Sequence, residues 1–168
     1  MRVSDVVYAF PALLLAMLLA AIYGGSTVTA MVAIGVASIP AFARVARAGA
    51  LQVMASDFVL AARASGTSRW GVASRHVLPN IAPLIGVQVS VGFAMAILAE
   101  AALSYLGLAT PRPNPTWGNM LRDAQELLGV APLQALWPGL AIALAVLGFN
   151  LLGDGLRDFL DPRLREVP

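Results

Sequence analysis

Apolar and polar residues follow one another along the chain in long blocks. Four blocks are almost wholly apolar: residues 6–23, 28–46, 81–103 and 136–153. As a helix, eighteen residues rise about 27 Å, which just spans a hydrocarbon core of about 30 Å. The pattern predicts an all-α integral membrane protein with about four transmembrane helices.

The first block also has one feature of a signal peptide, because Arg2 precedes an apolar run. Asp5 interrupts that basic flank, however, and Pro11 lies early in the run. A second spanning block follows at once. We therefore interpret residues 6–23 as a transmembrane helix.

Residues 104–135 separate the third block from the fourth. The segment Pro-Arg-Pro-Asn-Pro at 111–115 has too many prolines for a helix or a central strand. Residues 120–128 are expected to form a short helix, with Asn119 as its N-cap. Trp117 and Trp137 at the two ends of this region fit an aromatic belt.

Residues 48–80 form the longest polar interruption. A helix over its first half would place Phe58, Ala62 and Gly66 on one line, with Ala61 and Ser65 beside them, so that one face carries mainly small side chains. Gly66 can end this helix in the left-handed conformation. A face of this kind lets the surface of another protein approach closely.

A second short helix should follow in the same segment. Ser68 can cap its N-terminus, and we expect it to end near Leu78 because Pro79 follows. The segment then consists of two short helices at an angle. An amphipathic segment at the membrane surface, with arginines at the headgroups, fits the residues equally well.

Composition supports the membrane assignment. Of the 168 residues, 59% are hydrophobic and 12% are charged, against roughly 45–50% and 25% in a soluble domain. With no cysteine there is no disulfide or thiolate metal site. The scattered carboxylates and the single histidine argue against any other metal site.

All eleven basic residues are arginines, and the chain has no lysine. A phosphate-binding loop of the Gly-x-x-x-x-Gly-Lys-Ser/Thr type needs a lysine, so any ATP site must lie on another subunit and no cofactor is expected on this chain. The arginines are dispersed between apolar blocks, which argues against a nucleic-acid partner.

The distribution of arginines predicts the topology. If the N-terminus is inside, the inner segments hold nine arginines and the outer segment 104–135 holds two, Arg112 and Arg122. Positively charged loops accumulate in the cytoplasm. Both termini and residues 48–80 are therefore expected to be cytoplasmic.

Several charged or aromatic residues have a possible interface or structural role. Arg44 and Arg47 lie one turn apart near the end of the second block, where membrane anchoring and specific docking both remain open. Glu100 in the third block is a functional candidate by position, although the helix should end within about a turn, which favours local capping or pairing. Trp117 and Asp154 complete this group.

A family resemblance follows from the motifs. Ala61-Ala62-x-x-x-Gly66, followed after nine residues by His76-x-Leu78-Pro79, resembles the "EAA" signature of permease subunits from binding-protein-dependent ABC importers. Motifs along the rest of the chain resemble the C-type subunit of the dipeptide/oligopeptide/nickel branch: Asp5-x-x-x-Ala9-Phe10-Pro11, Ala43-Arg44-x-x-Arg47, Glu100-Ala-x-Leu103-Ser104-x-Leu106-Gly107-Leu108, Pro115-x-Trp117-Gly118-Asn119-Met120-Leu121 and Asn150-Leu-Leu-Gly-Asp154-Gly-Leu-Arg157-Asp158-x-Leu160-Asp161-Pro162-Arg163.

The resemblance implies a fold, a location and partners. The fold would be a type I ABC importer-like transmembrane domain in a bacterial or archaeal plasma membrane. The partners would be a second permease subunit, two cytoplasmic ATPase subunits and an extracytoplasmic solute-binding protein. The chain would form part of the pathway for peptides or related small solutes, with ATP hydrolysis on the partner subunits.

The resemblance also assigns the ATPase-coupling residues. Ala61, Ala62 and Gly66 would enter a groove of the ATPase. His76, Leu78 and Pro79 would fix the angle of the second helix.

Two departures from the family stand out. Leu60 occupies the position of the signature's glutamate. Family members also have two further membrane helices before the point that corresponds to Met1. We therefore expect this chain to be a partial transmembrane domain that lacks those two helices, and an inactive truncated permease fragment is one alternative.

Two other classes are less consistent with the residues. An intramembrane enzyme would need His76 to act with Ser65 or Ser74, and no third orienting group is evident. A secondary transporter is the stronger alternative, because it also uses helices broken by glycine and proline, and the third block contains Pro83, Gly86 and Gly92.

Overall fold

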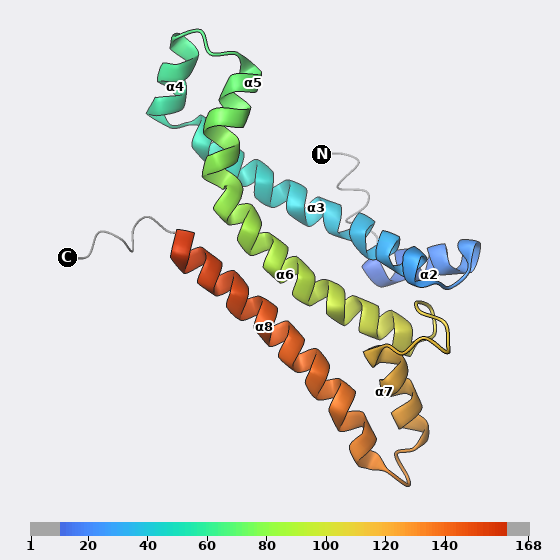
Figure 1. The fold of residues 1–168 in the computed structure, drawn as a ribbon. Helices are drawn as coiled ribbons and strands as arrows, with labels where there is room; N and C mark the ends of the chain where they lie inside the picture. Colours follow the sequence, from blue (N-terminus) through green and yellow to red (C-terminus); the bar gives the residue numbers. More distant parts are fainter. Residues whose placement is uncertain (1–10, 161–168) are drawn as a thin grey trace, which may run out of the picture. The chain divides into compact units, whose positions relative to one another are not determined.

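The computed structural model describes residues 11–160, and every regular element in that range is helical. The elements are α2 (Ala12–Tyr23), α3 (Thr27–Met54), α4 (Asp57–Ala64), α5 (Arg69–Val72), the π-helical turn η1 (Ala73–Val77), α6 (Leu78–Tyr105), α7 (Trp117–Glu126), the 3-10 turn η2 (Pro132–Ala135) and α8 (Leu136–Leu160) (Figure 1). The predicted motif residues before Pro11 and after Leu160 lie outside the described residues.

Three helical stretches are long and apolar enough to cross a membrane: Thr27–Met54, Arg69–Tyr105 and Pro132–Phe159. They contain the second, third and fourth predicted blocks. Of the first predicted block, residues 6–23, the structure describes the 12-residue helix α2. The all-helical membrane architecture predicted from the sequence is confirmed for the described part of the chain.

Two helices continue past their predicted ends. α3 ends at Met54 and not at residue 46, and α8 ends at Leu160 and not at residue 153. In α3 the seven residues after Arg47 include alanine, leucine, glutamine and methionine, which favour helix, and no proline. The arginines mark a change in polarity but do not end the helix, so the connection before α4 is much shorter than predicted.

The expectation that the second short helix ends near Leu78 is wrong. Residues 69–105 form one continuous helix that passes through Pro79. Proline lacks an N–H, and its ring collides with the carbonyl four residues earlier in an α-helix. The π-helical turn Ala73–Val77 precedes it, and this wider turn changes the hydrogen-bond pattern just where proline would disrupt it.

The chain divides into two compact units, and the three long helices contribute to both. The first unit comprises Met1–Pro40 and Gly92–Asn150. Its core is formed mainly by small side chains, with Ala16, Ala30, Ala33, Leu103 and Ala109 buried together. Small residues at such contacts let helix backbones approach closely, as is common between membrane helices.

The second unit comprises Ala41–Val91 and Leu151–Pro168. Its core contains Val59 from α4, Val72 from α5, Val77 from η1 and Ile81 from α6. Partly buried side chains from the end of α3 pack against this cluster. The core therefore joins the short helices to the ends of two long ones.

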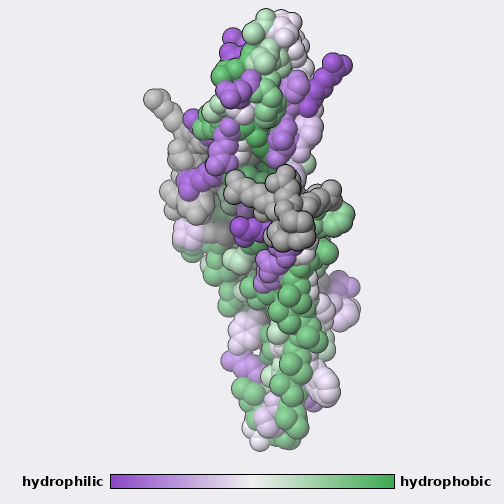
Figure 2. All heavy atoms as spheres, turned by 90° about the vertical axis from the view of Figure 1, so that its left-hand side faces the viewer, coloured by the Kyte–Doolittle hydropathy of each residue, from purple (hydrophilic) through white to green (hydrophobic). Residues whose placement is uncertain are grey.

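Figure 2 shows hydrophilic side chains gathered at the top of the view, around α4 and α5. In the first unit, many large apolar side chains are exposed, among them Leu140, Leu144 and Leu147 on α8. Exposed apolar surface of this extent is expected where lipid or another subunit covers a helix.

Candidate functional site

The candidate site is a helical hairpin formed by α4 and α5 in the second unit (Figure 1). Asp57 begins α4, where a carboxylate interacts favourably with the positive end of the helix dipole. Val59 is fully buried in the core of this unit and fixes α4 against the helix that follows. The opposite side of α4 remains exposed.

The turn between the two helices is a Schellman motif. Gly66 has a φ of +81°. Its N–H donates to the carbonyl of Arg63 at 3.1 Å, and the N–H of Thr67 donates to the carbonyl of Ala62 at 3.1 Å, which are the two bonds that define this motif. The prediction that Gly66 ends the first helix in the left-handed conformation is confirmed.

The predicted cap of the second helix is also confirmed. The Ser68 hydroxyl accepts a hydrogen bond from the backbone N–H of Gly71 at 3.1 Å. Ser68 has an extended backbone, as expected of an N-cap. The close spacing of Gly66 and Ser68 therefore sets both where α4 ends and where α5 begins.

The exposed side of α4 carries small residues together with the half-exposed Leu60, and it is rotated from the predicted line. Ala61, Ala64 and Ser65 are exposed, whereas Ala62 is half-buried. Phe58 lies toward the second helix, with its ring centroid 6.2 Å from that of His76. Ala64 was not singled out from the sequence, although it lies three residues after Ala61 and so shares its face.

The structure also places the three residues expected to fix the second helix. His76 lies in the π-helical turn and is partly buried. Its carbonyl accepts a hydrogen bond from Nδ2 of Asn80 at 2.6 Å. Leu78 and Pro79 are exposed at the start of α6. These three residues therefore surround the junction between the hairpin and the spanning part of the helix.

Glu100 forms a local pair. Its Oε1 accepts a hydrogen bond from the hydroxyl of Ser104, one turn later, at 2.6 Å. Ser104 is fully buried and Glu100 is half-buried near the end of α6. The pairing within one helix agrees with the local role that the sequence favoured over a functional one.

The remaining candidates lie on elements other than α4 and α5. Arg44 and Arg47 are exposed on α3, and Asp154 is exposed on α8. Trp117 is the first residue of α7 in the other unit. Within residues 11–160, no group of three or more histidines, aspartates and glutamates is close enough to hold a metal ion.

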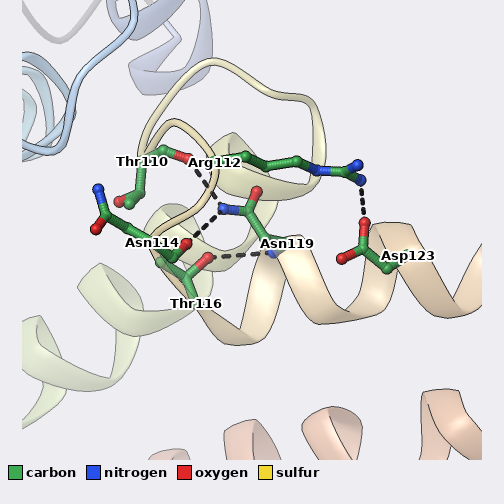
Figure 3. Close-up of polar contacts among 6 residues, drawn as sticks. All are labelled: Thr110, Arg112, Asn114, Thr116, Asn119 and Asp123. Atoms are coloured by element: carbon green, nitrogen blue, oxygen red, sulfur yellow. Dashed lines mark hydrogen bonds and ion pairs between the residues drawn. The ribbon is translucent and has the colours of Figure 1, made fainter.

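The segment before α7, residues 110–116, is held in place by a polar network (Figure 3). Nδ2 of Asn119 donates to the carbonyls of Thr110 at 2.9 Å and Asn114 at 3.3 Å. Arg112 and Asp123 form an ion pair at the surface. The network ties the proline-rich segment to the first two turns of α7.

The predicted cap of this helix is wrong by one turn. The cap is Thr116, whose hydroxyl accepts from the N–H of Asn119 at 3.1 Å, and α7 begins at Trp117. Both Thr116 and Asn119 have side chains suited to capping. Asn119 instead binds carbonyls of the preceding segment, a long-range requirement that the local sequence does not reveal.

α7 packs very closely on the end of α6. A Cβ atom added to Gly118 would lie 2.2 Å from the carbonyl oxygen of Ala101 and 2.9 Å from the backbone nitrogen of Tyr105. The end of α6 is itself a Schellman motif, in which Gly107 has a φ of +77° and the N–H of Leu108 donates to the carbonyl of Leu103 at 2.8 Å. Glycine is therefore required at two positions around this contact.

The fold and the hairpin together define a class of protein. The chain is a helical membrane domain, with three helices long enough to span, and one of these begins in a capped helical hairpin. Residues 1–166 match the family "Binding-protein-dependent transport system inner membrane component". The chain belongs to this family.

Curated relatives give the same family relationship. The chain is 44% identical over 166 residues to a "Dipeptide transport system permease protein DppC" of Alkalihalophilus pseudofirmus, covering 98% of this chain and 54% of the relative. It is 45% identical over 166 residues to a "Glutathione transport system permease protein GsiD" of Pectobacterium atrosepticum, covering 99% and 55%. The chain spans about half the length of the curated relatives it matches.

Proposed function

We propose that the chain is a permease subunit of an ABC importer and forms part of the membrane pathway for peptides or related small solutes. The relatives are named for dipeptide and glutathione transport, and both solutes contain peptide bonds. The proposed partners are a second permease subunit, two cytoplasmic ATPase subunits and an extracytoplasmic binding protein. ATP would be hydrolysed on the ATPase subunits.

The observation that carries this proposal is the α4–α5 hairpin. It presents a short, capped helix with exposed small side chains, and α5 continues without a break into the apolar helix that ends at Tyr105. A helix with a small-residue face can enter a groove of another protein. Because the second helix of the hairpin continues into a spanning segment, a push on the hairpin acts directly on that segment.

The residues keep the roles that the family resemblance implies. Ala61 and Gly66 lie exposed at the contact face, and Ala62 lies at its edge. His76, Leu78 and Pro79 would hold the second helix at the angle needed for coupling. ATP-driven movement then requires that the pathway has two states, and that the docked ATPase shifts the equilibrium between them.

We also propose an orientation in which the hairpin and both termini are cytoplasmic. The support is the arginine distribution, nine on the inner segments against two on the outer one. All three arginines in the hairpin region are exposed: Arg63, Arg69 and Arg75.

Ala61→Leu tests the docking role. The leucine fills the space that an approaching surface needs, so ATP-driven peptide uptake by the assembled importer should fall at least tenfold, while the amount of inserted protein stays unchanged. Ala102→Leu on the exposed side of α6 is the control and should leave uptake unchanged. Normal uptake by the Ala61→Leu variant would refute the docking assignment.

Gly66 needs a separate design, because its φ of +81° strains any side chain. Gly66→Leu changes both bulk and backbone and should abolish uptake. Gly66→Asn is the informative partner, since asparagine tolerates the left-handed conformation best among the other residues. Asparagine should retain more uptake than leucine if the cap is preserved and bulk is what excludes the ATPase.

A further inference from the structure

A cavity of about 610 Å³ lies behind the exposed face of α4, within the second unit. Its apolar wall is formed by Ala50 and Met54 at the end of α3 and by Val72 and Val77 of the second helix. Binding pockets for small molecules fall in the range of about 300–1,000 Å³. The cavity is therefore large enough to receive a group from another molecule.

Two arginines line the same cavity, Arg63 from α4 and Arg69 from α5. Among the described residues, neither has an ion-pair partner. The only acidic residue between positions 48 and 80 is Asp57, which does not line the cavity. The complementary occupant is an apolar group that carries a carboxylate or a phosphate.

The position of the cavity along α3 separates a protein from a lipid as the occupant. With Arg47 at the headgroups, Met54 lies about 10 Å further along the helix, at 1.5 Å per residue. The headgroup layer on one side of a bilayer is only about 5–8 Å thick. In the proposed orientation the Met54 end of the cavity therefore lies past the headgroups and opens to the cytoplasm.

We propose that this cavity receives an apolar side chain, next to an aspartate or glutamate, from the cytoplasmic ATPase subunit. The proposal rests on the proposed function and adds a second contact to it. Arg63 lies two residues after Ala61, which places the two side chains about 200° apart around α4. The ATPase would then hold α4 from opposite sides, with its groove on the Ala61 face and its acidic segment in the cavity.

The contact would matter because a helix bound on two faces stays attached to its partner more firmly than a helix bound on one. A carboxylate bound between Arg63 and Arg69 would therefore strengthen the attachment of the hairpin to the ATPase when the ATPase pulls on it. Each solvent-accessible ion pair stabilises a contact by up to about fivefold in affinity.

The absence of cysteine from the chain allows a direct test. In the assembled importer, Ala73→Cys in the cavity and Ala61→Cys on the exposed face would each carry a benzophenone maleimide. Both positions are exposed, so they can be labelled. After illumination, both positions should cross-link to the ATPase, each to a different peptide of that subunit. The ATPase peptide joined to position 73 should contain an aspartate or glutamate beside an apolar residue. Ala102→Cys, exposed on α6, should not cross-link to the ATPase.

Charge variants test the chemistry of the contact. Arg63→Gln and Arg69→Gln should each reduce the cross-link from position 73 by up to about fivefold. Arg75→Gln is the control, because this exposed arginine lies in the same region but does not line the cavity. An unchanged yield in the double glutamine variant would overturn the proposal.

The two positions also separate this proposal from the proposed function. If position 61 cross-links to the ATPase but position 73 reaches only lipid, another segment of a permease or nothing, the cavity proposal is overturned and the docking role of α4 stands. If neither position reaches the ATPase, the proposed function fails as well.

Discussion

The close contact between α7 and α6 makes Gly118→Ala the most demanding test of the structure. The added Cβ would lie 2.2 Å from the carbonyl oxygen of Ala101 and 2.7 Å from Cβ of Ser104. Real Cβ atoms essentially never come within 3.0 Å of such neighbours, so the two backbones must separate by at least 0.8 Å, the difference between 3.0 and 2.2 Å. No flexible side chain can absorb this shift, because the nearest atom belongs to the backbone.

The cost follows from what the separation disrupts. Overpacking of a close contact costs about 1–3 kcal/mol. Moving α7 also weakens the two hydrogen bonds from Asn119 to the preceding segment, which contribute about 0.5–1.5 kcal/mol each. We therefore expect Gly118→Ala to destabilise the docking of α7 by about 2–6 kcal/mol.

A cysteine reporter can measure this local opening in the membrane. Ala124 on α7 is only 2% exposed, so Ala124→Cys should react slowly with a water-soluble maleimide. A loss of about 2 kcal/mol or more in docking should increase the labelling rate at least about thirtyfold, since each 1.4 kcal/mol changes an equilibrium tenfold. Gly129→Ala is the matched control, because its Cβ would meet nothing within 4 Å. Equal labelling in the Gly118→Ala and Gly129→Ala backgrounds would refute the close packing.

Three further changes test other contacts. Asn119→Asp places a carboxylate against the carbonyls of Thr110 and Asn114 and should destabilise the segment 110–116 by about 1–3 kcal/mol. This should appear as faster proteolysis between residues 110 and 116. Asn114→Asp should behave like the parent, because only the backbone of Asn114 takes part in the network. Deleting Ser74 should convert the π-helical turn Ala73–Val77 into α-helix, so that the ring of Pro79 collides with the carbonyl four residues before it and the helix is destabilised by about 3 kcal/mol. ATPase co-purification should then be lost, and unchanged co-purification would contradict the role of this turn in holding the hairpin. Arg112→Gln should reduce the stability of the detergent-solubilised protein by less than about 1 kcal/mol, measured by thermal unfolding, because both side chains of the Arg112–Asp123 ion pair are more than half exposed. A larger loss would contradict the weak contribution expected of an exposed ion pair.

The sequence predicts features that depend on neighbouring residues. Gly66 and Ser68 end one helix and start the next through hydrogen bonds within six residues, so local chemistry was sufficient to place both. The long apolar blocks likewise predicted the spanning helices, because their length matches the bilayer. Family motifs located the hairpin that the structure shows between α3 and α6.

Features that depend on distant contacts were missed. Pro79 indicated a helix end, and only the π-helical turn before it explains why the helix continues. Thr116 and Asn119 are equally good caps by residue type, and the choice between them depends on where the carbonyl of Thr110 lies. The cavity lined by Arg63 and Arg69 also needs the end of α3, whose helical extension to Met54 was not predicted.

The two Schellman motifs, at Gly66 and at Gly107, have a consequence for how the protein is made. Each is closed by hydrogen bonds that span at most six consecutive residues. Each turn can therefore form soon after its residues leave the ribosome, before any other subunit is present. The lengths of α4 and α6 would then already be set during insertion into the membrane. Substitutions of Gly107, which follows a spanning helix, should therefore reduce the yield of inserted protein, whereas substitutions of Gly66 should leave insertion intact.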